Sequence, residues 1–386
     1  MTQEPDYQYI DSNEGLAEYC ASIGGASYCV VDTEFIREST YYPELALIQI
    51  ASGDRLACVD PPAISDLEPL AELLVEPGLL KVFHSSSQDL EVLYQKFGTV
   101  PSPVFDTQLA AAVLGYSHQI SYADLVQQII GTTLDKKHTR ANWLRRPLSR
   151  DELDYAMDDV RYLSAVYEAL KQKLESTGRS SWLEKDLHAM SDPRNYQVDM
   201  AQLFRRLKGV QRLKGEKLQI VSDLCRWREE LAQRQNRPRR WIVKDDALIE
   251  IARQKPRDIE ALVQIAELSE KTARRYGDEL LDIISRAAQV DPARWPRHDK
   301  LQSLNKQQLA LGDCLMALCR EIADQNQIAL ATLATRKDID NLILNQKSSR
   351  LAQGWRFSMA GEQLLEFIHG QSAISVADEA LKLEPR

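Results

Sequence analysis

Two carboxylates near the start of the chain have a spacing that suits metal-dependent chemistry. Asp32 and Glu34 are two positions apart in an apolar, β-prone run, so both side chains project from the same face of a strand. Carboxylates held this close repel one another and resist desolvation unless a cation lies between them. An exposed acidic strand end would show the same spacing, so the pair alone indicates little.

Three further candidates lie on predicted helices. Asp89 falls in a first helical turn, where the helix dipole alone favours an acid, although α/β folds also present functional groups at such junctions. Tyr155 and Asp159 are four positions apart, which places them one turn apart on one helical face. A phenol there could orient a water bound to a metal. The alternative is a solvated helix face with a tyrosine packed at its edge, and we expect Asp158 to be solvated.

The elements that must position these residues indicate an α/β domain in the first 175 residues. Apolar runs separated by turn-prone stretches predict an antiparallel meander, and helical spacing with capping residues predicts the helices that follow. The predicted strands cover 28–35, 45–50, 55–59 and 80–84, and the predicted helices cover 67–74, the stretch from a capping Ser85 or Ser86 to Phe97, and 151–174.

Beyond Asp192-Pro193-Arg194 the sequence is helical in character throughout. Residues 231–236 resemble residues 322–327 at an offset of about 91 positions, and an Asp-containing helix start follows each stretch. Such internal similarity predicts two helical modules of common origin, separated by residues 292–296.

Composition excludes several classes of protein. Of the 386 residues, 44% are hydrophobic and 27% are charged, which is typical of soluble globular proteins and excludes disordered and fibrous chains. No apolar run reaches the roughly 18–20 residues of a membrane span, and the first residues lack a signal-peptide pattern. We therefore expect a cytoplasmic protein that does not contact membranes.

Charge is distributed unevenly along the chain. The net charge of −9 argues at first against a nucleic-acid partner. Counted by segment, residues 1–200 carry −15, residues 201–290 carry +6, and residues 291–386 are neutral. An acidic first domain is therefore joined to a basic helical module, which is compatible with nucleic-acid binding.

The order of the motifs resembles a known enzyme family. A strand Asp-x-Glu, a helix-start Asp and a helical Tyr-x-x-x-Asp resemble the three motifs of the four-carboxylate 3′→5′ exonucleases. The third motif is of the tyrosine type, because Asp154 stands where the histidine type would place His. Further segments are similar to ribonuclease D in particular: Phe105-Asp106-Thr107-Gln108, Leu134-Asp135-Lys136, the stretch 143–149, and residues 215–290, which resemble the helical HRDC domain.

This resemblance implies a fold class of α/β plus all-α. The expected parts are a ribonuclease H-like, mixed-sheet exonuclease domain with its connector and two small HRDC-like helical bundles. Their expected boundaries are 1–200 for the exonuclease domain, 205–292 and 297–372 for the helical domains, and 373–386 for a C-terminal tail.

The resemblance also implies the cofactors and the roles of the site residues. Two divalent ions about 4 Å apart can activate water and stabilise the leaving oxygen of a phosphodiester. Hard ions such as Mg²⁺ or Mn²⁺ prefer oxygen ligands. The family pattern assigns Asp32, Glu34, Asp89 and Asp159 as metal ligands, with Asp32 bridging both ions, and Tyr155 as the residue that orients the attacking water.

The function implied is that of a monomeric 3′→5′ exoribonuclease. It would trim the 3′ ends of tRNA precursors and other small structured RNAs and release nucleoside 5′-monophosphates. A DNA exonuclease of the same mechanism stays open, because the carboxylates do not distinguish the two substrates. A non-catalytic RNA-binding scaffold and a protein-interaction adaptor are further alternatives, although neither accounts for all four carboxylates.

Most candidate substrate contacts lie in two basic stretches with embedded aromatics, one before the Tyr155 helix and one in the first helical module; Phe35, beside the acid pair, and Gln108 lie outside them. The candidates are Phe35, Gln108, Lys136, Arg140, Trp143, Arg146, Arg239, Arg240 and Trp241. Core packing of the aromatics and solvation of the basic side chains are the alternatives, and the helical modules could bind RNA or protein. We expect His84 to be a hydrogen-bonded strand-end histidine, because two-metal hydrolysis needs no imidazole.

Overall fold

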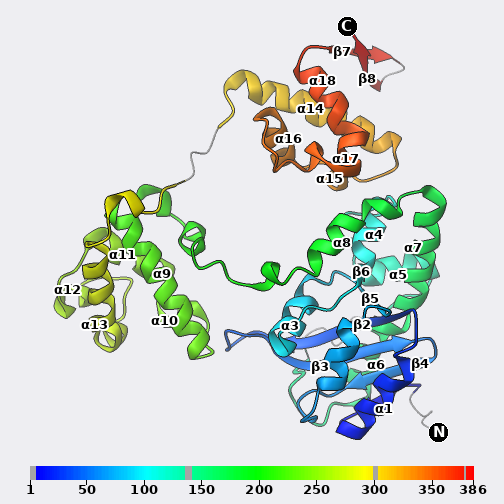
Figure 1. Ribbon diagram of the computed structural model, residues 1–386, viewed down its shortest axis with the longest axis horizontal. Helices are drawn as coiled ribbons and strands as arrows, with labels where there is room; N and C mark the ends of the chain where they lie inside the picture. Colours follow the sequence, from blue (N-terminus) through cyan, green and yellow to red (C-terminus); the bar gives the residue numbers. More distant parts are fainter. Residues whose placement is uncertain (1–5, 135–140, 299–302, 378–379) are drawn as a thin grey trace. The chain divides into compact units, whose positions relative to one another are not determined.

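The computed structural model describes residues 6–134, 141–298, 303–377 and 380–386. The chain divides into two compact units, which are drawn in Figure 1. Unit 1 comprises residues 1–34, 45–195 and 302–386, and unit 2 comprises residues 35–44 and 196–301. Among the described residues, no helix combines the length and the apolarity that crossing a membrane requires.

A six-stranded mixed sheet forms the centre of the first domain, with the strand order β1-β4-β3-β2-β5-β6. The β1–β4, β2–β5 and β5–β6 pairs are parallel, whereas β3 and β4 are antiparallel. The mixed α/β domain is thus confirmed. The strands are β1 (Gln8–Ile10), β2 (Tyr28–Ile36), β3 (Glu44–Ser52), β4 (Arg55–Val59), β5 (Leu80–Phe83) and β6 (Val104–Asp106).

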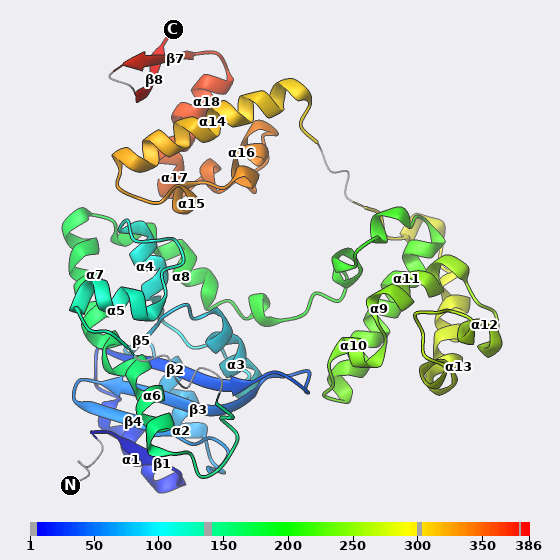
Figure 2. The same ribbon diagram turned by 180° about the vertical axis from the view of Figure 1, so that it is seen from behind.

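Helices cover both faces of this sheet. Figures 1 and 2, which view the molecule from opposite sides, show α1 on one face and α6 on the other. Apolar side chains of α6 and α7 pack on Val30, Ala46 and Val82 of three adjacent strands. The helices are α1 (Asn13–Ile23), α2 (Glu68–Val75), α3 (Ser87–Phe97), α4 (Thr107–Val113), α5 (Tyr122–Ile130), α6 (Arg150–Arg161), α7 (Leu163–Thr177) and α8 (Glu184–Met190).

Two of the predicted helices differ in detail from the structure. The predicted helix over 151–174 is two helices, because Tyr162 interrupts it between α6 and α7. The apolar spacing continues across a single irregular residue, so the sequence pattern did not reveal the break. Ser86 is the N-cap of α3 as predicted, but its hydroxyl donates to Asp106 and does not cap the helix.

The first helical module lies in unit 2 and has its own apolar core. Its central helix, α9, packs against α11 and α13. Residues 35–44, which follow Glu34 directly, belong to the same unit, and the Asn236 side chain accepts hydrogen bonds from the backbone of Tyr41 and Tyr42. The helices are α9 (Glu216–Arg234), α10 (Arg239–Ile242), α11 (Asp245–Gln254), α12 (Ile259–Val263) and α13 (Glu270–Ala287).

The second helical module repeats the first with the predicted offset of 91 residues. Helices α10 and α15 correspond residue by residue, and so do the starts of α11 and α16. Asn236 and Gln327, also 91 positions apart, both adopt the left-handed conformation after the first helix of their module. The module contains α14 (Lys306–Gln325), α15 (Leu330–Leu333), α16 (Arg336–Ile343), α17 (Gly354–Arg356), α18 (Glu362–Ile368) and a hairpin of β7 (Ser372–Ala377) and β8 (Ala380–Pro385). The hairpin contradicts the expectation of helix throughout this part of the chain, because Ile374, Leu381 and Leu383 pack on the module's core from paired strands.

Within unit 1, this second module packs against the exonuclease domain. Trp182 and Trp355 stack with ring centroids 4.4 Å apart and an interplanar angle of 6°. Gly115 has a φ of +94°, and a Cβ atom there would come within 2.3 Å of the Gln327 carbonyl oxygen. Only glycine therefore permits this backbone approach.

Candidate active site

Strand β2 and helix α6 bring three of the predicted carboxylates together. Asp32 and Glu34 belong to β2, and Asp159 belongs to α6. One carboxylate oxygen of each residue lies within 4.8 Å of those of the other two. All three side chains are partly buried. Three oxygen donors at this separation suit a hard divalent cation.

Asp89 lies beside this group at the start of α3. Its side chain is 8% exposed, and its Oδ1 accepts a hydrogen bond of 2.5 Å from Thr33 Oγ1. Thr33 stands between the two carboxylates of β2, so this bond ties Asp89 to the strand that carries them. The charge of Asp89 also raises the pKa values of Asp32 and Glu34.

Burial raises the pKa of every one of these carboxyl groups; the other members of the group repel Asp32, Glu34 and Asp159, whereas Asp89 is repelled by Asp106. Burial raises the pKa of Glu34 to about 8, that of Asp159 to about 7 and that of Asp89 to about 6, with repulsion from neighbouring carboxylates adding to each. Burial and the other three carboxylates hold the pKa of Asp32 well above its usual range. A bound cation would remove this repulsion, so the donor set fits divalent metal ions.

Tyr155 lies one turn before Asp159 on α6, as its spacing predicts. Its ring stacks on Trp143, with centroids 6.3 Å apart and an interplanar angle of 23°. Trp143 is only 3% exposed and belongs to the core beneath α6. Of the two roles expected for Trp143, base stacking and core packing, its buried ring agrees with core packing.

Comparison with known proteins identifies the family. Models described as 3'-5' exonuclease and HRDC domain match residues 7–175 and 217–284. Ribonuclease D of Granulibacter bethesdensis is 36% identical over 98% of this chain and 97% of its own length. The crystal structure of Escherichia coli RNase D, an exoribonuclease involved in structured RNA processing, matches with a TM-score of 0.85 and 29% identity, over 94% of this chain and 99% of that chain.

The chain belongs to the ribonuclease D family. A second relative, the ribonuclease D of Sphingobium indicum, is 36% identical over 97% of each chain. Membership in the ribonuclease D family makes the chain a hydrolase of the exoribonuclease class, acting on RNA. The exonuclease fold of this family implies divalent metal ions, in agreement with the carboxylate cluster.

Several candidate substrate contacts are engaged within the protein. Arg146 binds Asp60 through Nε and Nη2, each 2.6 Å from a carboxylate oxygen. The Gln108 side chain donates to the Ile120 carbonyl oxygen at 3.0 Å. Arg239 pairs with the buried Glu229. Each of these side chains therefore has a structural role that the sequence did not show.

The other candidates divide into three cases. Phe35 is partly buried and belongs to unit 2. Arg240 is exposed, and Trp241 is 57% exposed, so both present their side chains to solvent. Lys136 and Arg140 lie outside the described residues.

Two residues near the candidate active site were not predicted from the sequence. The Tyr122 hydroxyl donates to the Asp158 carbonyl oxygen at 3.0 Å, next to Asp159 on α6, and no local pattern could have revealed this contact. Asp106 hydrogen-bonds the start of α3, and its place in the Phe105–Gln108 motif was the only signal. His84 is hydrogen-bonded to Thr107 and Ile120, which confirms the expected structural role.

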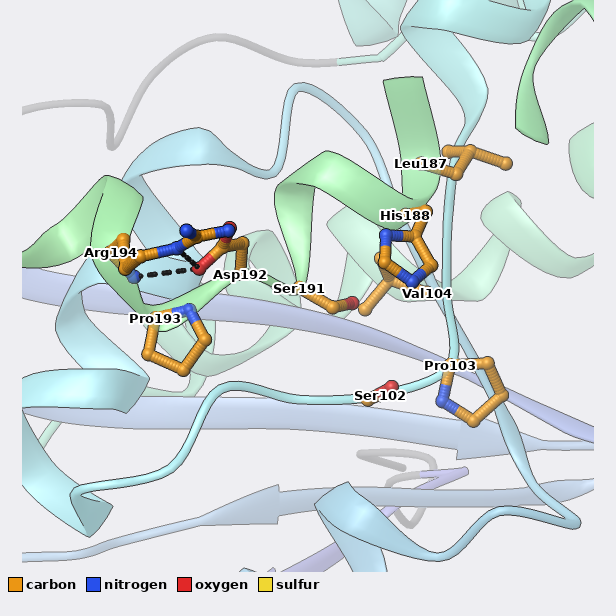
Figure 3. Close-up of a pocket in the computed structure, with 9 residues that line it drawn as sticks. All are labelled: Ser102, Pro103, Val104, Leu187, His188, Ser191, Asp192, Pro193 and Arg194. Atoms are coloured by element: carbon orange, nitrogen blue, oxygen red, sulfur yellow. Dashed lines mark hydrogen bonds and ion pairs between the residues drawn. The ribbon is translucent and has the colours of Figure 1, made fainter. Parts of the chain in front are cut away.

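A separate hollow lies beside the edge strand β6, where α8 and the following turn meet residues 102–104 (Figure 3). Arg194 folds back onto Asp192 in this hollow, with Nη2 2.6 Å from a carboxylate oxygen. The lining residues are Ser102, Pro103, Val104, Leu187, His188, Ser191, Asp192, Pro193 and Arg194. Among the described residues, none of those predicted for catalysis or substrate contact lines this hollow.

Proposed function

We propose that this chain is a two-metal 3′→5′ exoribonuclease that trims the 3′ ends of tRNA precursors and other small structured RNAs. Nucleoside 5′-monophosphates are its products, and it acts as a monomer in the cytoplasm. The observation that carries the proposal is the cluster of Asp32, Glu34 and Asp159 with Asp89 beside it. Four carboxylates in one partly buried place are unfavourable unless cations neutralise them.

The proposed roles follow from the positions of the side chains. Asp32, Glu34 and Asp159 would hold one divalent ion, and Asp32 with Asp89 would hold a second. Bound there, Mg²⁺ or Mn²⁺ supplies Lewis acidity at the attacking and leaving oxygens of the phosphodiester. Tyr155, which lies one turn before Asp159 and stacks on the buried Trp143, would orient the attacking water; these positions support the proposal.

Exposed residues of the first helical module are proposed to bind the body of the RNA. Arg240 and Trp241 combine a cation with an exposed indole, which suits phosphate contact and base stacking. The +6 charge of residues 201–290 supports this assignment. A protein-binding role for the module is the alternative.

A single substrate comparison tests the proposal. The full chain is incubated with 3′-extended tRNA and with single-stranded DNA, in Mg²⁺ or Mn²⁺ and then in excess chelator, and products are identified by mass spectrometry. We expect stepwise loss of nucleoside 5′-monophosphates from the RNA, abolished by the chelator. Preferential degradation of the DNA would favour the DNA exonuclease, and RNA binding without hydrolysis would favour the scaffold.

A further inference from the structure

Asp106 is a buried carboxylate that lies outside the proposed metal cluster. It ends strand β6, is the N-cap of α4 and is 1% exposed. An ordinary N-cap carboxylate accepts one or two hydrogen bonds from the first turn of its own helix. Asp106 accepts those and several more.

The additional bonds come from a different element. Oδ1 of Asp106 accepts from the backbone N–H groups of Gln108 and Leu109 at 2.8 and 3.2 Å, which caps α4. Oδ2 accepts from the N–H and the hydroxyl of Ser86 at 2.8 and 2.9 Å, and the Ser85 N–H lies 3.3 Å from Oδ1. One carboxylate therefore holds the starts of both α4 and α3.

The start of α3 determines where Asp89 lies. Ser85 has a φ of +61°, an uncommon conformation for a residue other than glycine, and Ser86 is the N-cap. The first bond of the helix runs from the Leu90 N–H to the Ser86 carbonyl oxygen at 2.9 Å. Asp89 stands three positions after Ser86, so the backbone geometry that Asp106 maintains sets the position of the Asp89 carboxylate.

We propose that Asp106 is a positioning residue for the Asp89 metal ligand. This inference rests on the proposed two-metal function. The Asp106 carboxylate holds the Ser85–Ser86 turn from one side, and Thr33 holds the Asp89 carboxyl from the other. Loss of the first contact lets the start of α3 move away from β2 and weakens metal binding without removing any ligand.

The test compares two buried aspartates in the full chain. Asp106→Asn replaces one acceptor oxygen with an NH₂ group that faces N–H donors. The matched control is Asp338→Asn, because Asp338 is also buried, at 5% exposed, and holds a helix start in the second module by accepting from Thr335. Mn²⁺ binding is measured by calorimetry and electron paramagnetic resonance, with circular dichroism to report folding.

We expect Asp106→Asn to weaken Mn²⁺ binding roughly 10- to 100-fold at the Asp89 site, the range seen for residues that support metal ligands. Asp338→Asn should lower the melting temperature and leave Mn²⁺ affinity unchanged. A folded Asp106→Asn variant with wild-type Mn²⁺ affinity overturns the inference. So does an equal loss of affinity in both variants.

A milder variant covers the case in which Asp106→Asn does not fold. Ser86→Ala removes the hydroxyl bond to Asp106 and keeps the backbone N–H bond, so we expect a smaller loss of Mn²⁺ affinity in the same direction. Unchanged affinity in Ser86→Ala would then overturn the inference. Failure of the two-metal function itself is distinguished by the wild type, which in that case binds no Mn²⁺ or binds it equally after Asp32→Asn.

Discussion

At the scale of single residues, two adjacent acids on α6 have different surroundings, and only one of them is a proposed metal ligand. Asp159 joins the cluster with Asp32 and Glu34. Asp158, which was expected to be solvated, is partly buried and pairs with Arg161. The sequence Asp158-Asp159 does not by itself say which acid faces the sheet, but the spacing from Tyr155 selected Asp159, and the structure places Asp159 in the cluster.

This adjacency provides a matched pair of variants. We expect Asp159→Asn to lower RNA hydrolysis by at least about a thousandfold, because a neutral amide cannot share a divalent cation with Asp32 and Glu34. Asp158→Asn should change the rate by less than about twofold, since its partner Arg161 is held independently by Asp6. Rates on 3′-extended tRNA in Mg²⁺ decide the matter, and a comparable loss in both variants would contradict the assignment.

The raised pKa of Glu34 has a consequence for stability. In the metal-free protein, folded Glu34 holds its proton up to about pH 8, whereas the unfolded chain releases it near pH 4.5. Between these values the folded state binds more protons than the unfolded state, so the free energy of unfolding falls as pH rises. We expect the melting temperature in chelator to drop between pH 6 and pH 8, and Glu34→Gln to reduce that drop. Parallel curves for variant and wild type would show that Glu34 does not cause it.

At the scale of elements, the stretch before α6 contains Arg146, a candidate RNA contact that instead binds other parts of the domain. Beyond its pair with Asp60, Arg146 donates to the carbonyl oxygens of Trp143 and Ala46 at 2.6 and 2.8 Å. Asp60 is 2% exposed, and although burial opposes it, the Arg146 hydrogen bonds hold the pKa of Asp60 below its usual value. Arg146 thereby joins the residues just before α6 to β3 and to the residue that follows β4.

Removing either partner of this pair should destabilise the domain. We expect Arg146→Ala to cost about 3 kcal/mol, because it leaves the buried Asp60 charge unpaired, and Asp60→Ala to cost less, because Arg146 reaches solvent. Chemical unfolding measures both. For folded protein, neither change should alter the salt dependence of RNA binding. A decrease of about one in that slope for Arg146→Ala alone would show that Arg146 contacts a phosphate.

Helices and strands were predicted correctly where local sequence patterns specify them. They were missed where their formation depends on pairing with a strand that is distant in the sequence. Helix α3 ends at Gly98 in the left-handed conformation, as its sequence indicates. Strands β1 and β6 have three residues each, which is too short for an alternating pattern to be recognised, and both depend on parallel pairing with distant strands. The side chain of Ser86 makes no capping bond, because the residue has helical backbone angles (φ −61°, ψ −8°) and not the extended ones of a capping serine; its hydroxyl donates to Asp106 instead.

At the scale of the whole molecule, the two helical modules have similar backbone folds but present different residues at equivalent surface positions. Arg240 and Trp241 on α10 are exposed, whereas the residues 91 positions later are Ala331 and Thr332. Thr332 is 2% exposed and lies against His118 of the exonuclease domain, within unit 1. The second module therefore uses for packing a position at which the first presents an indole to solvent.

Substitutions of the exposed Arg240 and Trp241 should affect RNA binding in two different ways. Arg240→Ala should weaken binding and lower the slope of log affinity against log salt by about one, since one phosphate contact is lost. Trp241→Ala should weaken binding by about 1–3 kcal/mol with the slope unchanged, because base stacking releases no counterions. Arg274→Ala, which removes an exposed cation paired with Glu270 on α13, is the control and should change neither quantity. Unaltered affinity in the first two variants would favour a protein-binding module.

The sequence by itself determined the fold class, the family and the places of the four carboxylates and Tyr155 along the elements. Strand alternation, helical spacing and the repeat at an offset of 91 residues are patterns of the sequence itself, so they can be recognised without the three-dimensional structure. Only the tertiary structure decided that Trp143 is buried beneath Tyr155, that Arg146 anchors a loop, and that Asp106 holds the start of α3. Those contacts join residues from separate elements, and packing determines them because every buried polar group must find a partner.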